Sequence, residues 1–264
     1  MENRRTYFKN ICKVLSWPIL FTIGQFFIQY IFVAIFNSKE RGTLTEVEFL
    51  KYIKKDEYIL KLNNYINSKI ILIMFISIII FLPLFYKIYK KYKEKGKIKI
   101  FIPIILGISI SLTYNILIYY LNKYFNFTDA YKLSSVPIFV QIISSGMLGP
   151  ILEEYLFRGI VYNKLKEFNK DKKAIILTGI IFGLFHSNII NGIYAFIINF
   201  VLIYLYNKYK TIKAPIIMHI VLNTTIIILL PLILKDYLIF NLYLLIMSIF
   251  ILIVVNYYFK KVNL

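Results

Sequence analysis

The chain has 264 residues, of which 59% are hydrophobic and 17% are charged, and its formal net charge is +19. Its mean hydropathy of +0.69 is well above that of soluble domains, which excludes an ordinary soluble globular protein. The single cysteine, Cys12, excludes an intrachain disulfide and a cysteine metal cluster. The charge alone would suit a nucleic-acid-binding protein, but its distribution along the chain, described below, argues against that class.

Apolar runs of about 17 to 23 residues recur along the chain, which is the helix length needed to cross ~30 Å of hydrocarbon. In chain order we predict eight spans, at residues 14–36, 70–86, 100–121, 136–160, 174–190, 192–206, 214–234 and 238–258. The first run is too long for a signal-peptide core and is expected to be retained. The predicted fold is therefore all-α: one transmembrane domain over residues 1–264, a polytopic bundle of about eight helices.

Basic residues fall mainly on one side of this arrangement. With the N-terminus inside, the inner segments carry about twice as many lysines and arginines as the outer segments, the bias that marks cytoplasmic loops. Acidic residues gather instead in a predicted extracytoplasmic polar loop at 37–69. We therefore expect both termini in the cytoplasm, basic loops lying against anionic lipid headgroups, and no nucleic-acid partner. The abundance of Ile, Lys, Asn and Tyr is typical of an AT-rich bacterial genome, so the expected location is a bacterial plasma membrane.

A few ionisable side chains lie inside the predicted spans, where such groups are costly and usually mark a functional site. Glu153, Glu154 and Arg158 lie in the fourth span. Glu154 and Arg158 are four residues apart with the acid first, which is the favourable order for a helical ion pair. Glu153 points about 100° away from Glu154 around the helix. We therefore expect one carboxylate to be structural and its neighbour to face a cavity.

The only two histidines also lie inside predicted spans, His186 in the fifth and His219 in the seventh. Phe182 precedes His186 by four residues and can pack beneath it, and Asn223 follows His219 by four, so those two project side by side. Counting from the basic turn between the fourth and fifth spans puts Glu153 and His186 at about the same height. Four other polar residues inside or near spans are predicted to make interhelical hydrogen bonds: Gln25, Asn115, Gln141 and Asn199.

Carboxylate, imidazole and amide groups at one depth suggest hydrolysis. A carboxylate can take a proton from water and pass it to the leaving amine. Histidine and asparagine can donate to the oxyanion of a tetrahedral intermediate. Alternatively, a glutamate and two histidines could bind a divalent metal such as zinc, with an open position for water. No serine, cysteine or threonine has a paired base at motif spacing, so a covalent mechanism is not favoured.

Three motifs in order resemble those of the CPBP family, the type II CAAX prenyl endopeptidases and their bacterial relatives, also called the Abi family. They are Glu153-Glu154-x-x-x-Arg158, Phe182-x-x-x-His186 and His219-x-x-x-Asn223. The resemblance covers roughly residues 135–230, which it identifies as a catalytic core. It implies an intramembrane endopeptidase whose cavity opens to the cytoplasm.

The resemblance also implies a role for each motif residue. Glu153 would be the water-activating base, helped by His186. The oxyanion site would be formed by His219 and Asn223. Three residues would support this arrangement from behind it: Glu154, Arg158 and Phe182. Two questions stay open: which glutamate activates water, and whether a metal takes part. The chain has too few histidines for a three-histidine zinc site and lacks H-E-x-x-H. If a metal is bound, its ligands would be Glu153, His186 and His219.

The expected substrate is a membrane-associated peptide or protein, in bacteriocin processing or immunity or in CAAX-type processing. Two alternatives remain. A non-catalytic membrane scaffold or bacteriocin-immunity protein would keep the motifs and act by binding a partner. A transporter would use the buried charges as a proton or cation site, although the chain has no evident inverted repeat. No prediction of oligomeric state follows from the sequence.

Overall fold

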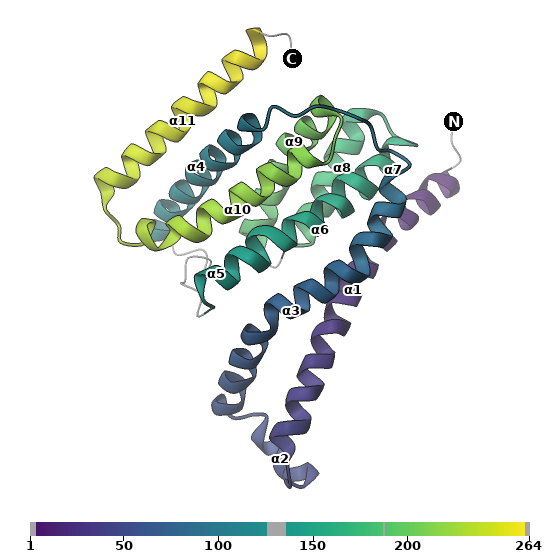
Figure 1. Cartoon of the computed structure of the whole chain (residues 1–264), viewed down its shortest axis with the longest axis vertical. Helices are drawn as coiled ribbons and strands as arrows, with labels where there is room; N and C mark the ends of the chain where they lie inside the picture. Colours follow the sequence, from purple (N-terminus) through teal and green to yellow (C-terminus); the bar gives the residue numbers. More distant parts are fainter. Residues whose placement is uncertain (1–3, 126–135, 187, 262–264) are drawn as a thin grey trace.

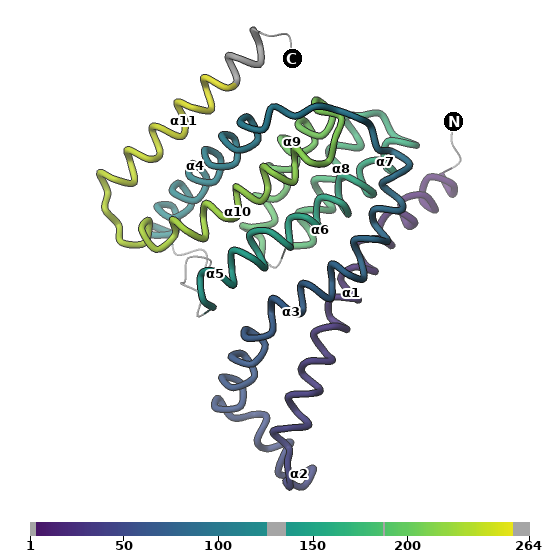
Figure 2. The backbone as a smooth tube through the Cα atoms, viewed as in Figure 1, coloured from purple at the N-terminus to yellow at the C-terminus, as the bar shows by residue number. Residues whose placement is uncertain are grey.

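The computed structural model describes residues 4–125, 136–186 and 188–261, the last six of these as backbone only. Every regular element in these ranges is a helix (Figure 1), which confirms the all-α prediction. The physical reason is that a backbone in hydrocarbon has no water to bond with, so each segment must satisfy its own N–H and C=O groups. Figure 2 shows the resulting path as a series of helices, with the connection from α3 (Asp56–Tyr89) to α4 (Phe101–Phe125) running across one end of the bundle.

Among the described residues, six helices are long and apolar enough to cross a membrane: α1 (Arg4–Arg41), α3 (Asp56–Tyr89), α4 (Phe101–Phe125), α9 (Ile189–Tyr209), α10 (Lys213–Ile233) and, up to Val255, α11 (Leu238–Lys261). The protein is therefore a multi-pass membrane protein. The predicted number of eight spans is approximate, because the fourth and fifth predicted spans take unusual forms.

The fourth predicted span is one long, continuous helical segment of changing pitch. It consists of α5 (Ile138–Gln141), the π-helical turns η1 (Ile142–Leu148), α6 (Gly149–Leu156), the π-helical turns η2 (Phe157–Tyr162) and α7 (Asn163–Lys166). All six residues of η2 are buried. π-helical turns inside α-helices are rare and often occur at functional sites. Here they stand on both sides of the turn that carries the two glutamates.

The fifth predicted span ends earlier than expected. The helix α8 (Asp171–Leu184) has 14 residues, or about 21 Å at ~1.5 Å per residue, which is too short to cross the hydrocarbon. The chain turns after Leu184, and Asn188 caps the start of α9 by accepting a hydrogen bond from the backbone N–H of Asn191 at 2.8 Å. The predicted span at 174–190 is therefore wrong at its C-terminal end, and His186 lies in a turn instead of a helix.

The segment predicted as a polar loop, residues 37–69, is mostly helical. It contains the end of α1, the short helix α2 (Glu46–Tyr52) and the start of α3. A capping box begins α2: the Thr45 hydroxyl accepts from the backbone N–H of Glu48, and the Glu48 carboxylate accepts from the backbone N–H of Thr45 at 2.8 Å. Figure 1 shows this hairpin projecting away from the other helices.

The helices pack around the composite fourth segment. Helix α10 packs against α4, against α9 and against η1 and α6, while α11 packs on the outer side of α4 and α3 packs against α6 (Figure 1). Helices α8 and α9 form a tight hairpin, because both glycines at their closest approach lack a side chain. A Cβ atom on Gly183 would lie 2.7 Å from the carbonyl oxygen of Gly192. This packing brings α4, α6, α8, α9 and α10 together around one cavity.

Candidate active site

A cavity of about 270 Å³ lies among these five helices. Its polar lining residues are Tyr114, Asn115, Glu153, His186, Asn191, Tyr194, His219 and Asn223, and its apolar lining residues are Phe182, Ala195, Ile198, Leu222 and Ile226. The four side chains that the sequence singled out as catalytic therefore share one cavity, although they come from α6, α10 and the turn after α8.

The two adjacent glutamates occupy different environments. The side chain of Glu154 is completely buried, whereas that of Glu153 is 31% exposed and lines the cavity. An α-helix turns by about 100° per residue, so neighbours cannot face the same way. The Glu154 Oε1 atom accepts a hydrogen bond from Arg158 Nη1 at 3.0 Å. The ion pair expected from the spacing is thus present, and it is fully buried.

Further contacts from α8 and α9 help to compensate the buried charge of Arg158. Its Nη2 atom donates to Asn199 Oδ1 at 3.3 Å, and its guanidinium carbon lies 4.4 Å from the centre of the Phe182 ring, a cation–π contact. The Asn199 amide nitrogen in turn donates to the carbonyl oxygen of Ile175 at 3.0 Å. Asn199 therefore makes the interhelical hydrogen bonds predicted for it, and ties α9 to η2 and α8.

His219 connects the two glutamates. Its Nδ1 atom lies 2.8 Å from Glu154 Oε1, and its Nε2 atom lies 3.8 Å from Glu153 Oε2. Glu154 already accepts a hydrogen bond from Arg158, and an ionised carboxylate can only accept. We therefore assign the hydrogen to Nδ1 of His219, which leaves Nε2 directed toward Glu153.

His186 is held by the end of its own helix. Its Nδ1 atom lies 2.8 Å from the carbonyl oxygen of Phe182, which can only accept, so Nδ1 carries the hydrogen and Nε2 of the neutral ring is an acceptor. The Phe182 ring meets His186 edge to face, with the ring centres 4.9 Å apart. Phe182 thus contacts both His186 and Arg158. The contact with His186 was predicted from the spacing of four residues, and the contact with Arg158 was not.

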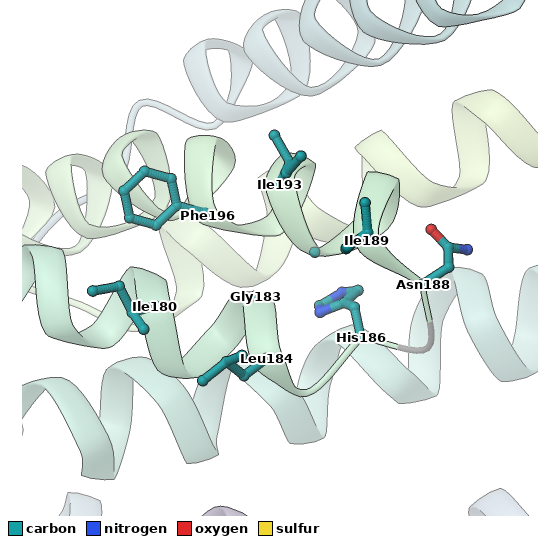
Figure 3. Close-up of a pocket in the computed structure, with 9 residues that line it drawn as sticks. Ile180, Gly183, Leu184, His186, Asn188, Ile189, Ile193 and Phe196 are labelled. Carbon is teal, nitrogen blue, oxygen red and sulfur yellow. The ribbon is translucent and has the colours of Figure 1, made fainter. Parts of the chain in front are cut away.

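His186 also lines a second, apolar groove of about 400 Å³ between α8 and α9 (Figure 3). The other residues of this groove are Ile180, Gly183, Leu184, Asn188, Ile189, Gly192, Ile193 and Phe196. Leu184 and Ile189 are 78% and 79% exposed, so the groove lies at the outer surface of the bundle. His186 therefore stands between the polar cavity and the apolar outer surface.

Asn223 is positioned by η1. Its amide nitrogen donates to the carbonyl oxygen of Ser145 at 3.0 Å, and its side chain lines the cavity one turn along α10 from His219. The approach of η1 to α10 is close because Gly146 lacks a side chain; a Cβ atom there would lie 3.0 Å from Thr224 Oγ1. The π-helical turns therefore set the position of Asn223.

The proposed metal ligands form only part of a metal site. Glu153 and the Nε2 atom of His219 face each other, and Nδ1 of each histidine is held by an oxygen, a common orientation for metal-bound imidazole. However, within residues 4–125, 136–186 and 188–261, no three His, Cys, Asp or Glu side chains group closely enough to hold an ion. The residues as they stand do not fit a three-ligand zinc site.

Sequence reasoning missed part of the cavity wall. The sequence analysis assigns no role to Tyr114, Asn191 or Tyr194, yet all three line the cavity. Gln25, like Asn199, makes the interhelical hydrogen bond predicted for it, since its Oε1 atom accepts from the Ser77 hydroxyl at 3.1 Å. Asn115 donates to the carbonyl oxygen of Ser111, one turn earlier in its own helix, at 2.8 Å. The signal that could have found part of the wall was the amide of Asn115 in the middle of the third predicted span.

Fold and site together define a multi-pass membrane protein with a buried carboxylate–histidine cavity. Residues 135–225 match the family model described as type II CAAX prenyl endopeptidase Rce1-like. A curated relative from Bacillus subtilis (strain 168), named "Putative membrane peptidase YdiL", is 33% identical over 96 residues. Over residues 135–225, the segment that carries the three motifs, the chain is similar to this family, in agreement with the resemblance.

The matches concern the segment that carries the cavity's glutamates and histidines. The alignment with the Bacillus subtilis relative covers 36% of this chain and 38% of that protein, so the chain aligns with little more than a third of the relative. No solved structure is a significant match. Helices α1 to α4 lie outside the matched segment, although α4 supplies two residues of the cavity wall.

Proposed function

We propose that this protein is an intramembrane endopeptidase in which Glu153 activates the attacking water. One observation carries the proposal: of two adjacent glutamates, Glu154 is fully buried and bonded to Arg158 and His219, whereas Glu153 lines the cavity with His186 and His219. A buried carboxylate that already accepts hydrogen bonds from two side chains is suited to support, and a cavity-facing one is suited to proton transfer. The matches to a peptidase family support the same reaction class.

The proposed reaction is hydrolysis by general acid–base catalysis. Glu153 takes a proton from water as the water oxygen attacks the carbonyl carbon of the scissile peptide bond, and Nε2 of neutral His186 accepts a hydrogen bond from the same water. The oxyanion of the tetrahedral intermediate accepts from the Asn223 amide and from Nε2 of doubly protonated His219. Glu153 then delivers its proton to the leaving nitrogen as the carbon–nitrogen bond breaks, which yields a carboxylic acid and an amine.

Glu154, Arg158 and Phe182 act in this scheme by holding other groups. Glu154 fixes the ring orientation of His219, and Arg158 compensates the charge of Glu154. Phe182 packs against both Arg158 and His186. None of the three lies between the proposed water and the peptide, so their substitution is expected to act through the position of the catalytic groups.

The proposed substrate is a peptide or protein at the membrane. The basic connections of the chain favour the cytoplasmic side of a bacterial plasma membrane for its basic end. The family resemblance suggests bacteriocin processing or immunity, or CAAX-type processing, as the setting. A metal-assisted version remains a separate prediction, tested by whether a chelator such as EDTA stops cleavage and added zinc restores it; the scheme above predicts no effect of either.

The experiment that tests this function compares new peptide N-termini in membranes from cells that produce the wild type, Glu153→Ala, His186→Ala or the surface control Glu94→Ala. The proposal predicts a defined set of N-termini that is present with the wild type and Glu94→Ala and lost in both site variants. Identical sets in wild type and Glu153→Ala, with the cellular phenotype retained in the variant, would refute peptidase function and favour the scaffold alternative.

A further inference from the structure

Four residues that line the cavity, apart from the proposed catalytic groups, are neutral and polar. Tyr114 and Asn115 come from α4, and Asn191 and Tyr194 come from α9. We call these four residues the amide–phenol wall. The titratable side chains among the other lining residues are Glu153, His186 and His219, all of which belong to the proposed reaction. The wall therefore adds hydrogen-bonding groups to the cavity without adding ionised charge.

The two halves of the wall are fixed to each other. The rings of Tyr114 and Tyr194 stack with centroids 3.8 Å apart and an angle of 17° between their planes. The Tyr114 hydroxyl also donates to the carbonyl oxygen of Ile190 at 3.1 Å. These contacts join α4 to the first turns of α9, one turn from His186. A side chain bound against this wall would therefore keep a fixed distance from the catalytic groups.

We infer that the amide–phenol wall binds the peptide backbone of the substrate. A peptide that is cleaved inside a membrane must be extended at the scissile bond, and its freed N–H and C=O groups have no water to bond with. Asparagine is suited to pair with such groups, because its amide is both a donor and an acceptor, as a peptide group is. The cavity volume of about 270 Å³ is close to the lower limit of typical small-molecule sites, roughly 300 Å³. It therefore has room for only a short stretch of peptide chain.

This inference rests on the proposed peptidase function but can fail independently of it. It assigns positioning roles to Asn115 and Asn191, and it predicts recognition of uncharged backbone with little preference for sequence. It also predicts that α4, which lies outside the segment matched by the family model, contributes to substrate binding. A purely structural role for the two asparagines predicts no dependence on the substrate's backbone N–H groups.

The test measures binding of a fluorescein-labelled, uncharged alanine–leucine hexapeptide amide to purified, full-length protein in detergent. A second probe is the same peptide with its backbone nitrogens methylated, which removes the donors. Binding is measured for Glu153→Gln, which prevents turnover, alone and combined with Asn115→Leu, Asn191→Leu or the control Asn122→Leu, two turns further along α4 and outside the cavity. Thermal unfolding of each variant checks that it is folded.

The inference predicts that Glu153→Gln binds the parent peptide at least about 10-fold more tightly than the methylated one. Each of Asn115→Leu and Asn191→Leu should weaken binding of the parent by about 2- to 10-fold, the usual worth of a neutral hydrogen bond. The same changes should leave the methylated probe nearly unaffected, and Asn122→Leu should change neither. Equal binding of both probes, no binding of either, or unchanged binding in folded Asn variants would overturn the inference. Intact binding with no cleavage by the wild type would instead refute the peptidase function alone.

Discussion

Glu154 and Arg158 are both completely buried, and each needs the other to remain so. Taking an ionised group out of water costs several kcal/mol, and a partner at hydrogen-bond distance offsets much of that cost. The pair also holds His219 and Asn199, so four side chains from three helical segments depend on it. The stability of the core and the order of the site are therefore linked through these two residues.

Removal of one member of this pair is predicted to be more damaging than removal of both. Glu154→Leu leaves a buried, uncompensated guanidinium and should lower the free energy of unfolding by roughly 3–5 kcal/mol. The double variant Glu154→Leu/Arg158→Leu removes both charges and should recover a large part of that loss. Unfolding in detergent, followed by circular dichroism, measures the difference. A double variant as unstable as the sum of the two single variants would contradict this reading.

The sequence predicted local pairs well and long-range partners poorly. The Glu154–Arg158 pair was predictable because both residues belong to one helix, whose pitch fixes their separation. The bond from Arg158 to Asn199 was not, because it depends on the rotation and height of α9 relative to η2.

Among the elements, the α8–α9 hairpin has the largest effect on the site. Its turn carries His186, and the helices meet at Gly183 and Gly192 without side chains between them. We predict that Gly183→Val separates the hairpin, because a Cβ atom at 183 would lie 2.7 Å from a backbone carbonyl oxygen. The expected result is a lower unfolding temperature and at least a 10-fold loss of cleavage. Leu184→Ala, at the exposed neighbouring position, is the matched control and should retain both properties.

The capping box of α2 predicts a local dependence on pH. Hydrogen bonds from the side chain and backbone of Thr45 lower the pKa of Glu48 below its ordinary value of 4.5. A lowered pKa in the folded state means that the box stabilises α2 above pH 4.5 and loses this contribution as the pH falls through the folded-state pKa. The protection of the α2 amides against hydrogen exchange, corrected for the intrinsic exchange rate at each pH, should therefore fall on acidification. In Thr45→Ala the exchange should be fast at neutral pH and show no such extra step; a wild-type profile in that variant would be the contrary result.

At this scale the sequence located the apolar centres of helices but not their ends. Hydropathy placed α1 and α3 correctly where they are apolar, and missed the polar helical turns at 37–41 and 56–69, where aromatic contacts such as that between Phe36 and Tyr58 join the two helices. It extended α8 past Leu184 because Phe185, Ile189 and Ile190 keep the average hydropathy of this stretch high. The turn there is set by the Asn188 cap, a signal that hydropathy does not register.

For the molecule as a whole, the described ends of the chain lie toward the same end of the bundle in Figure 1. This agrees with an even number of crossings and with basic connections gathered on one side. In a Cys12→Ser background, which removes the native thiol, we predict that Glu46→Cys reacts with a membrane-impermeant maleimide in intact cells. Lys95→Cys, also exposed, should react only after the cells are opened. The reverse pattern would invert the proposed orientation, and with it the side from which substrate reaches the cavity.

The central claim is a division of roles between two adjacent carboxylates, and the most direct test compares Glu153→Gln with Glu154→Gln. Formation of substrate fragments and the unfolding temperature would be measured on the same purified samples. The account predicts that Glu153→Gln keeps the wild-type unfolding temperature and forms no fragments, whereas Glu154→Gln unfolds at a lower temperature and retains some cleavage per folded molecule. Wild-type cleavage by folded Glu153→Gln would contradict the account, and would assign the activation of water elsewhere in the cavity.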